Sequence, residues 1–220
     1  EALGADYQVA TLEDILRDHV APYGIPASVG AELPAVPNFS VSTGSSEWQV
    51  VYEFCRYYGG IAPRFDRYGR LVIAPWPDGE RRVLGPDAAV TRLTLRDQRY
   101  GVLSQVLVRD RTSEEVQTVA DGDFLRRGGR SRRVLTMPGK SSYQAMRYSG
   151  EYQLARAREE LRTLELELPA AFAAWPGELV ELRLAQNVGT GLWRVRERVS
   201  AQEERGSYTR LTLAPPDAVG

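Results

Sequence analysis

The sequence predicts an α+β protein, in which a small two-helix plus β-hairpin domain is followed by an antiparallel β-barrel with one inserted long helix. Three observations support this. Apolar residues recur twice at helical spacing before residue 60, and they alternate with polar residues in most segments after residue 90. Between these regions, Pro75, Pro77 and Gly79 interrupt any regular element. We therefore expect two domains, at residues 1–80 and 81–220.

Two short amphipathic helices are predicted in the first domain. Thr11 is a suitable N-cap for a helix that stops before Pro22, and acidic residues follow in its first turn. Ser45 or Ser46 can cap a second helix, which Gly59-Gly60 ends. The Gly- and Pro-rich segment between the helices is expected to be a connector.

A β-hairpin is predicted after the second helix. Two short apolar runs, 61–65 and 71–73, flank the turn Asp66-Arg67-Tyr68-Gly69. Because Pro75 and Pro77 follow directly, the hairpin is expected to close the first domain.

Strands dominate the second domain. Strands at 90–97 and 102–109 are joined around Tyr100-Gly101, and shorter strands are expected at 116–119 and 134–135. The inserted helix is predicted over 143–164 from one apolar face and charged pairs four positions apart. Alternating patterns between glycine-containing turns then predict four closing strands, at 164–168, 179–184, 192–199 and 208–213.

Composition excludes several classes of function. The chain has 28 Lys+Arg and 29 Asp+Glu, a net charge of −1, which argues against a general nucleic-acid binder. Apolar residues make up 43%, enough for a real core. A single cysteine, Cys55, excludes an internal disulfide, and a single histidine, His19, leaves no Cys/His cluster for zinc. We expect no metal and no cofactor.

Targeting features are not evident in the sequence. No apolar run approaches the ~18 residues that a membrane helix needs. The start, Glu1-Ala2-Leu3-Gly4, lacks the charged and apolar regions of a signal peptide. A soluble, unexported protein with no membrane partner is therefore expected. Because the first residue is not Met, we also expect a processed chain or a C-terminal fragment.

The sequence gives only weak evidence for any catalytic residue. His19 has no serine or cysteine motif nearby and is expected to be a partly buried or capping histidine, while Cys55 is expected to be a core residue. Glu165 and Glu167 point to one face of a strand, as in a half-solvated sheet. A carboxylate pair for glycoside hydrolysis stays open, because its separation is spatial. No phosphate loop or nucleophile elbow is present. We predict no catalytic residues and no enzyme.

One local charge anomaly stands out. Five arginines occur within eight residues, around Gly128-Gly129: Arg126, Arg127, Arg130, Arg132 and Arg133. They can contact phosphates or an acidic protein surface, or form a solvated loop, and no aromatic platform is interleaved with them. We expect this segment to be a partner-contact loop that touches an acidic neighbour.

The first third contains an ordered series of motifs: a helix start, a Gly-Ile turn, a capped aromatic helix ending in glycine, and a Phe-Asp-x-x-Gly-x-Leu hairpin, at residues 11–16, 22–25, 41–48, 54–60 and 65–73. In order and spacing, this series resembles the phage baseplate hub family, the Mu-like and T4-like tail hubs related to late control D. The C-terminal half resembles the return of these hubs from an inserted helix into a final barrel sheet, at residues 155–158, 164–168, 175–180, 191–195 and 206–213.

The resemblance implies a structural role. It implies a homotrimeric hub, with a tail-tube-like barrel, that joins the hexameric tail tube to the trimeric central spike of a phage tail or contractile injection system. It further implies assembly in the bacterial cytoplasm, a place in the virion, and no nucleic-acid partner except DNA passing through the lumen. The resemblance also implies a first barrel before the segment at residue 11, and we expect this barrel to be missing or truncated here.

Two other functions stay open on the sequence alone. Trp175, Trp193 and the arginines suggest a β-barrel module that binds glycan or nucleic acid. The abundant carboxylates leave room for a tail-associated cell-wall hydrolase.

Overall fold

The computed structural model describes residues 1–77, 79–98, 100–111, 115–138, 141–204 and 206–217. The chain forms two compact units, each built from two segments. Unit 1 comprises Glu1–Pro75 and Leu103–Ala155, and unit 2 comprises Trp76–Val102 and Arg156–Gly220. This division differs from the predicted domains 1–80 and 81–220, because residues 103–155 group with the N-terminal segment.

The N-terminal segment of unit 1 contains two small sheets and two helices. In order, its elements are β1 (Ala5–Ala10), α1 (Leu12–His19), a 3-10 turn (Ala21–Tyr23), β2 (Ala27–Val29), β3 (Val36–Val41), α2 (Glu47–Phe54), a π turn (Cys55–Gly59), β4 (Arg64–Phe65) and β5 (Leu71–Ile73). Strands β1 and β3 pair antiparallel, while β5 pairs antiparallel with β4 and parallel with β2.

The two predicted helices and the hairpin are confirmed. The Thr11 side chain caps α1 by accepting from the Asp14 N–H, and Asp14 accepts in return from the Thr11 N–H, which makes a complete capping box. Ser46, rather than Ser45, caps α2 by accepting from the Gln49 N–H. The β4–β5 pair is the expected hairpin.

The expected connector between the helices is wrong, because it contains β2 and β3. Pro37 lies within β3, directly opposite Val9 of β1. A proline is tolerated there because, within the described part of the chain, β3 is an edge strand that pairs with β1 alone. The proline nitrogen, which has no hydrogen to donate, can face the open edge. Strand β1 was not predicted.

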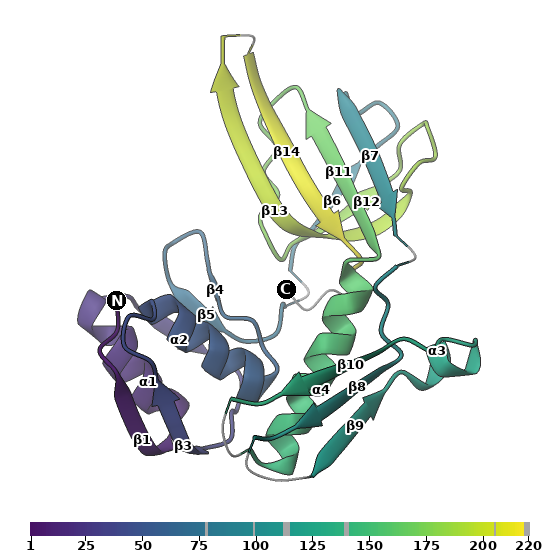
Figure 1. The fold of residues 1–220 in the computed structure, drawn as a ribbon. Helices are drawn as coiled ribbons and strands as arrows, with labels where there is room; N and C mark the ends of the chain where they lie inside the picture. Colours follow the sequence, from purple (N-terminus) through teal and green to yellow (C-terminus); the bar gives the residue numbers. More distant parts are fainter. Residues whose placement is uncertain (78, 99, 112–114, 139–140, 205, 218–220) are drawn as a thin grey trace. The chain divides into compact units, whose positions relative to one another are not determined.

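The second segment of unit 1 is a three-stranded sheet with a long helix. Its elements are β8 (Gln105–Arg109), β9 (Val116–Ala120), α3 (Gly122–Arg126), β10 (Arg132–Thr136) and α4 (Tyr143–Glu159), with strand order β10-β8-β9 (Figure 1). Helix α4 lies close to this sheet, since a Cβ at Gly150 would stand 2.5 Å from Cγ2 of Val119. Val106 and Val108 are fully buried.

The two segments of unit 1 are joined by close packing. Gly60 has φ +64, and a Cβ there would lie 2.7 Å from the carbonyl oxygen of Tyr148 on α4. Within the N-terminal segment, Phe39 meets Phe54 edge-on at a centroid distance of 5.2 Å, and Tyr58 packs against both rings. These buried aromatic rings form the core beneath α2.

Unit 2 is a six-stranded sheet that curls into a half-barrel (Figure 1). Leucines on its inner face, among them Leu164, Leu166, Leu211 and Leu213, are fully buried. The strand order is β6 (Arg81–Leu84), β12 (Leu179–Leu182), β13 (Gly191–Glu203), β14 (Gly206–Ala214), β11 (Arg162–Leu168) and β7 (Arg92–Asp97).

The α+β class is confirmed, but three details differ from prediction. Among the described residues no pairing joins β6 to β7, and β6 runs parallel to β12, so the sheet is neither closed nor purely antiparallel. The predicted helix over 143–164 ends at Glu159, because Leu164 pairs with Leu95 and Leu213 in the sheet. The consecutive strands β7 and β8 belong to different sheets. No helix in the described part of the chain is long and apolar enough to span a membrane.

Candidate functional site

A pocket of about 260 Å³ opens in unit 1 beside the last turn of α1 and the first turn of α2. We call it the α1–α2 pocket. It combines a polar floor with an apolar and aromatic wall, lined by Glu1, His19, Val20, Tyr23, Ile25, Glu47, Trp48, Val51, Phe65 and Leu71.

The floor of the α1–α2 pocket is a carboxylate held by two side chains. Nδ1 of His19 lies 2.5 Å from Oε2 of Glu47, and the Tyr23 hydroxyl donates to Oε1 of Glu47 at 3.1 Å. Burial raises the pKa of Glu47, but the hydrogen bonds from His19 and Tyr23 outweigh it and bring that pKa below its ordinary value. Glu47 is therefore an ionised group at neutral pH.

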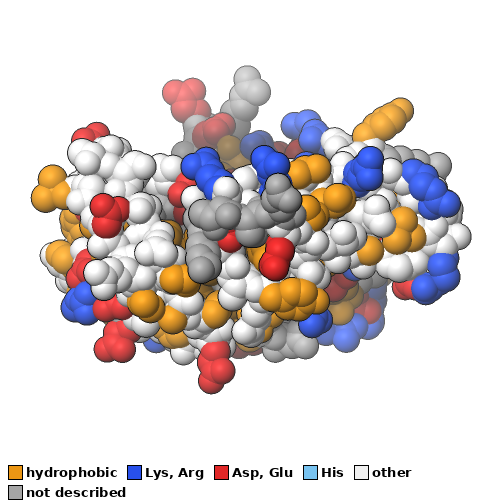
Figure 2. Space-filling model, turned by 60° about the horizontal axis from the view of Figure 1, so that its bottom comes forward, with side chains coloured by type: hydrophobic (Ala, Val, Ile, Leu, Met, Phe, Trp, Pro, Cys, Tyr) orange, Lys and Arg blue, Asp and Glu red, His pale blue; other side chains and the backbone are white. Residues whose placement is uncertain are grey.

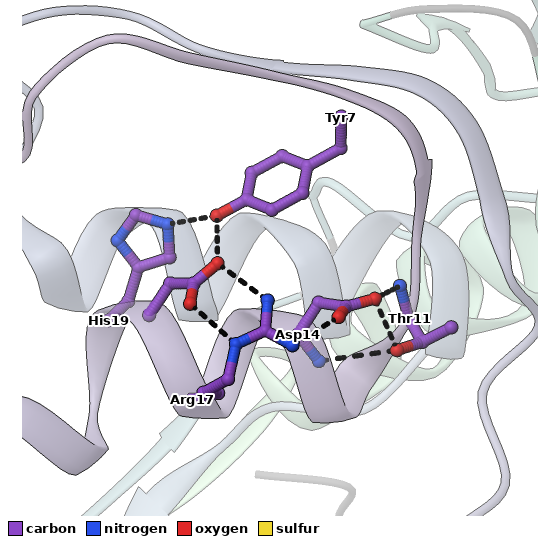
Figure 3. A network of polar contacts seen from close by, with 6 residues as sticks. Tyr7, Thr11, Asp14, Arg17 and His19 are labelled. Atoms are coloured by element: carbon purple, nitrogen blue, oxygen red, sulfur yellow. Dashed lines mark hydrogen bonds and ion pairs between the residues drawn. The ribbon is translucent and has the colours of Figure 1, made fainter.

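The other ring nitrogen of His19 faces Tyr7 (Figure 3). The Tyr7 hydroxyl lies 3.2 Å from Nε2 of His19 and donates to Oδ2 of Asp18 at 2.9 Å. Arg17 donates to both oxygens of Asp18, at 2.8 and 3.0 Å, and these bonds lower the pKa of Asp18. Burial, together with the Asp18 bond, raises the pKa of Tyr7 to about 12.

This network indicates a structural role for His19. It is buried, as expected, and each ring nitrogen already has a neighbour that can share a proton with it. General-base catalysis would need one nitrogen to face a nucleophile. The polar contacts instead join α1, α2 and β1.

Exposed aromatic rings form the rim of the pocket. Trp48 is 42% exposed and Phe65 is 50% exposed, and their ring centroids lie 5.3 Å apart. Tyr23 is 57% exposed at the same pocket. Aromatic faces beside a carboxylate are a combination that binds cations. Sequence reasoning missed this rim, since Trp48 looks like one apolar helix position and Phe65 like one hairpin position.

Trp175 and Trp193, which suggested a glycan-binding platform, do not form an exposed aromatic surface. Trp193 is buried, and its Nε1 donates to the carbonyl of Gly189 at 2.6 Å. The Trp175 ring is stacked by the guanidinium of Arg198, 4.4 Å from its centroid. The Trp193 ring is therefore not available as a platform, and one face of the Trp175 ring is occupied by Arg198.

The five arginines of the predicted loop are divided between a helix, a turn and a strand. Arg126 ends α3 and pairs with Asp123, and Arg130 donates to the carbonyls of Leu125 and Gly129 at 3.2 and 2.9 Å. The guanidinium of Arg127 lies 5.8 Å from the Phe124 ring centroid.

The last two arginines belong to β10 and differ in their contacts. Arg133 donates to Oε1 of Gln153 on α4 at 3.1 Å. Arg132 lies on the neighbouring position of β10 and is exposed. All five arginines are exposed, and Arg127 and Arg132 lack the local hydrogen bonds or ion pairs that Arg126, Arg130 and Arg133 form among the described residues.

Two other residues considered from the sequence are ion-paired or buried. Glu167 accepts from Arg210 at 2.9 Å, which lowers its pKa, and from the hydroxyl of Thr91 at 3.2 Å. Cys55 is fully buried, and burial raises the pKa of its thiol to about 12. In the described part of the chain, no group of three or more His, Cys, Asp or Glu side chains is arranged to hold a metal ion.

Comparisons with known proteins give a consistent result. No protein-family model and no curated protein matches the sequence. Among solved structures, a tail protein from Neisseria meningitidis MC58 superposes over 97% of this chain and 71% of its own, with a TM-score of 0.74 and 17% identity. The 43 kDa tail protein of prophage MuSo2 from Shewanella oneidensis covers 97% of this chain and 66% of its own, with a TM-score of 0.68 and 16% identity.

A third structure extends the same fold beyond phages. The E. coli c3393 protein is a type VI secretion component described as structurally similar to the T4 bacteriophage tail proteins gp27 and gp5. It covers all of this chain and 53% of its own, with a TM-score of 0.59 and 15% identity. The chain thus has the fold of phage and prophage tail proteins, and the resemblance to tail hubs expected from sequence is confirmed at the level of the fold. It spans from about half to 71% of the length of these structures.

Proposed function

We propose that this protein is a non-enzymatic structural component of a phage tail or a related contractile injection system. In this proposal it is a homotrimeric baseplate hub that joins the hexameric tail tube to the trimeric central spike. The observation that carries the proposal is the fold shared with the Neisseria tail protein over 97% of this chain, at a TM-score of 0.74. The protein would assemble in the bacterial cytoplasm and reside in the virion.

The half-barrel of unit 2 supports the proposal. Its outermost strands, β6 and β7, each pair with only one neighbour among the described residues. Open strand edges carry unpaired N–H and C=O groups, which pair readily with strands of a neighbouring subunit. An assembly in which subunits complete one another's sheets would use these edges.

Oligomeric state and location in the particle test the proposal together. Light scattering on the purified protein is expected to give a trimer. An epitope-tagged copy that complements a gene deletion is expected at the end of the tail by immunogold electron microscopy. Complete, infectious particles without the protein would contradict the proposal.

The same preparations test the two alternatives. Clearing of a cell-wall suspension would favour a tail-associated hydrolase over a structural hub. Retention on immobilised glycan or DNA, with salt-dependent release from DNA, would favour a binding module.

A further inference from the structure

The α1–α2 pocket has the chemistry of a receptor for a guanidinium group. Trp48 is 42% exposed and its ring lies near those of Tyr52 and Phe65, at centroid distances of 6.0 and 5.3 Å, whereas Phe65 is 50% exposed at the end of this aromatic row. The Glu47 carboxylate lines the same pocket. A planar guanidinium stacks on aromatic rings and donates to a carboxylate at the same time, whereas an ammonium group acts as a point charge. The pocket therefore favours arginine over lysine.

The α1 side of the pocket carries a net negative charge, because Asp14 and Asp18 share one cationic partner, Arg17. Asp14 and Asp18 on α1 are held by hydrogen bonds, Asp14 from Thr11 and Asp18 from Arg17, which lower the pKa of each carboxyl group. Both are thus ionised at neutral pH, like Glu47. On the face shown in Figure 2, acidic side chains are more numerous toward the left and arginines toward the right.

Matching donors are found on the same chain. Arg127 and Arg132 are exposed and form no ion pair with any described residue, although the guanidinium of Arg127 lies 5.8 Å from the Phe124 ring centroid. Arg126 pairs with Asp123, and Arg130 donates to nearby carbonyls. In unit 1, α3 lies on the side away from β1 and α1, so the segment that follows α3 starts far from the pocket of its own chain (Figure 1). A second copy can supply the donors.

We propose that the α1–α2 pocket binds Arg127 or Arg132 of a second copy of this chain, forming a head-to-tail interface between subunits. Such an interface uses a different surface on each partner, and repetition around a rotation axis closes it into a ring. This inference deepens the proposed function, on whose homotrimer it rests. The acidic neighbour expected for the arginine segment is then a second copy of the same protein.

The test uses two variants that each lose one half of the interface. Arg127→Gln/Arg132→Gln removes the donors, and Phe65→Arg places a positive charge on the pocket rim while leaving the His19–Glu47 contact intact. Each variant alone is expected to self-associate about tenfold more weakly than wild type, by analytical ultracentrifugation. An equimolar mixture is expected to form a one-to-one complex, because the donors of one variant still fit the intact pocket of the other.

Matched controls separate this effect from charge or misfolding. Arg126→Gln/Arg130→Gln removes the same charge from the same segment, and Tyr68→Arg adds the same charge to an exposed position of the β4–β5 turn that does not line the pocket. Both are expected to associate like wild type. Thermal melts verify that every variant is folded.

The possible outcomes separate this inference from the proposed function. If wild type and all variants form equal trimers, the head-to-tail interface is overturned while the hub proposal stands. Failure of the variant mixture to form a one-to-one complex also overturns it. A wild-type chain that stays monomeric at about 0.1 mM overturns it as well, since a functional interface is expected to be populated there, and immunogold labelling then decides the hub proposal separately.

Discussion

His19 and Glu47 are 28 positions apart in the sequence, yet Nδ1 of His19 lies 2.5 Å from Oε2 of Glu47. The contact joins the last turn of α1 to the first turn of α2, where a carboxylate is also favoured by the helix dipole. The same carboxylate forms the floor of the α1–α2 pocket. One residue pair therefore links the packing of the helices to the chemistry of the candidate site.

Replacing Glu47 with Gln is expected to lower the free energy of unfolding at pH 7 by about 2 kcal/mol, since a charged hydrogen-bond acceptor is lost. The pKa of Glu47 is lowered in the folded state. Its contribution is therefore complete above the ordinary value of about 4.3 and is lost as pH falls through the lower folded value. Urea unfolding at several pH values measures this. Glu53→Gln, also on α2, is the control, and an acid dependence unchanged in Glu47→Gln would contradict the prediction.

Thr11→Ala is expected to destabilise the protein by about 1 kcal/mol, because it removes the side chain that caps α1. Thr11→Ser keeps a hydroxyl at the N-cap and serves as the matched control. Urea denaturation of both variants measures the difference. Equal stability of the two would mean that the capping box contributes nothing.

Gly60→Ala is expected to lower the free energy of unfolding by about 3 kcal/mol. Alanine is strained at the positive φ of this position, and its Cβ would lie 2.7 Å from the Tyr148 carbonyl oxygen. Gly44 also has a positive φ, +86, but nothing lies within 4 Å of its ideal Cβ. Gly44→Ala is therefore the control for backbone strain alone, at about 1 kcal/mol. Chemical denaturation that gives equal costs would argue against the close approach of α4.

Arg194→Met is expected to destabilise unit 2 by about 3 kcal/mol. The buried Arg194 guanidinium donates to the carbonyls of Pro77, Gly177 and Pro216 at 3.0, 2.9 and 2.8 Å. Methionine fills similar space but leaves those acceptors without this donor. Arg92→Met, at an exposed position of β7, is the control in the same denaturation experiment. A cost below that of the control would show that the three bonds are not needed.

Cys55 is expected to be unreactive in the folded protein. It is the single thiol of the chain, and burial raises its pKa to about 12, so little thiolate forms at pH 8. Reaction with Ellman's reagent is expected only after denaturant is added, when labelling should be complete. Rapid stoichiometric labelling of the native protein would contradict this burial.

Elements defined by local chemistry were predicted well. The capped starts of α1 and α2, the turn of the β4–β5 hairpin and the alternating leucines of β11 and β14 depend on neighbours within a few residues. Such signals are present in any short window of the sequence.

Elements that depend on distant partners were missed or misplaced. Strand β3 contains Pro37 and becomes a strand only because β1 lies beside it. Leu164 suits a helical face as well as a strand, and pairing with Leu95 and Leu213 decides for the strand. The candidate site depends in the same way on Trp48, Phe65 and Glu47 being brought together from α2 and β4.

The sequence by itself determined the α+β class, the two capped helices, the hairpin and the pattern of the last strands, because side-chain spacing and caps act locally. Only the tertiary structure decided that residues 103–155 group with the N-terminal segment, that the six-stranded sheet is an open half-barrel, and that His19 meets Glu47 beneath an aromatic rim. These features arise from contacts between residues far apart in the chain. The free energy of such contacts depends on the whole packed unit, which no local pattern encodes.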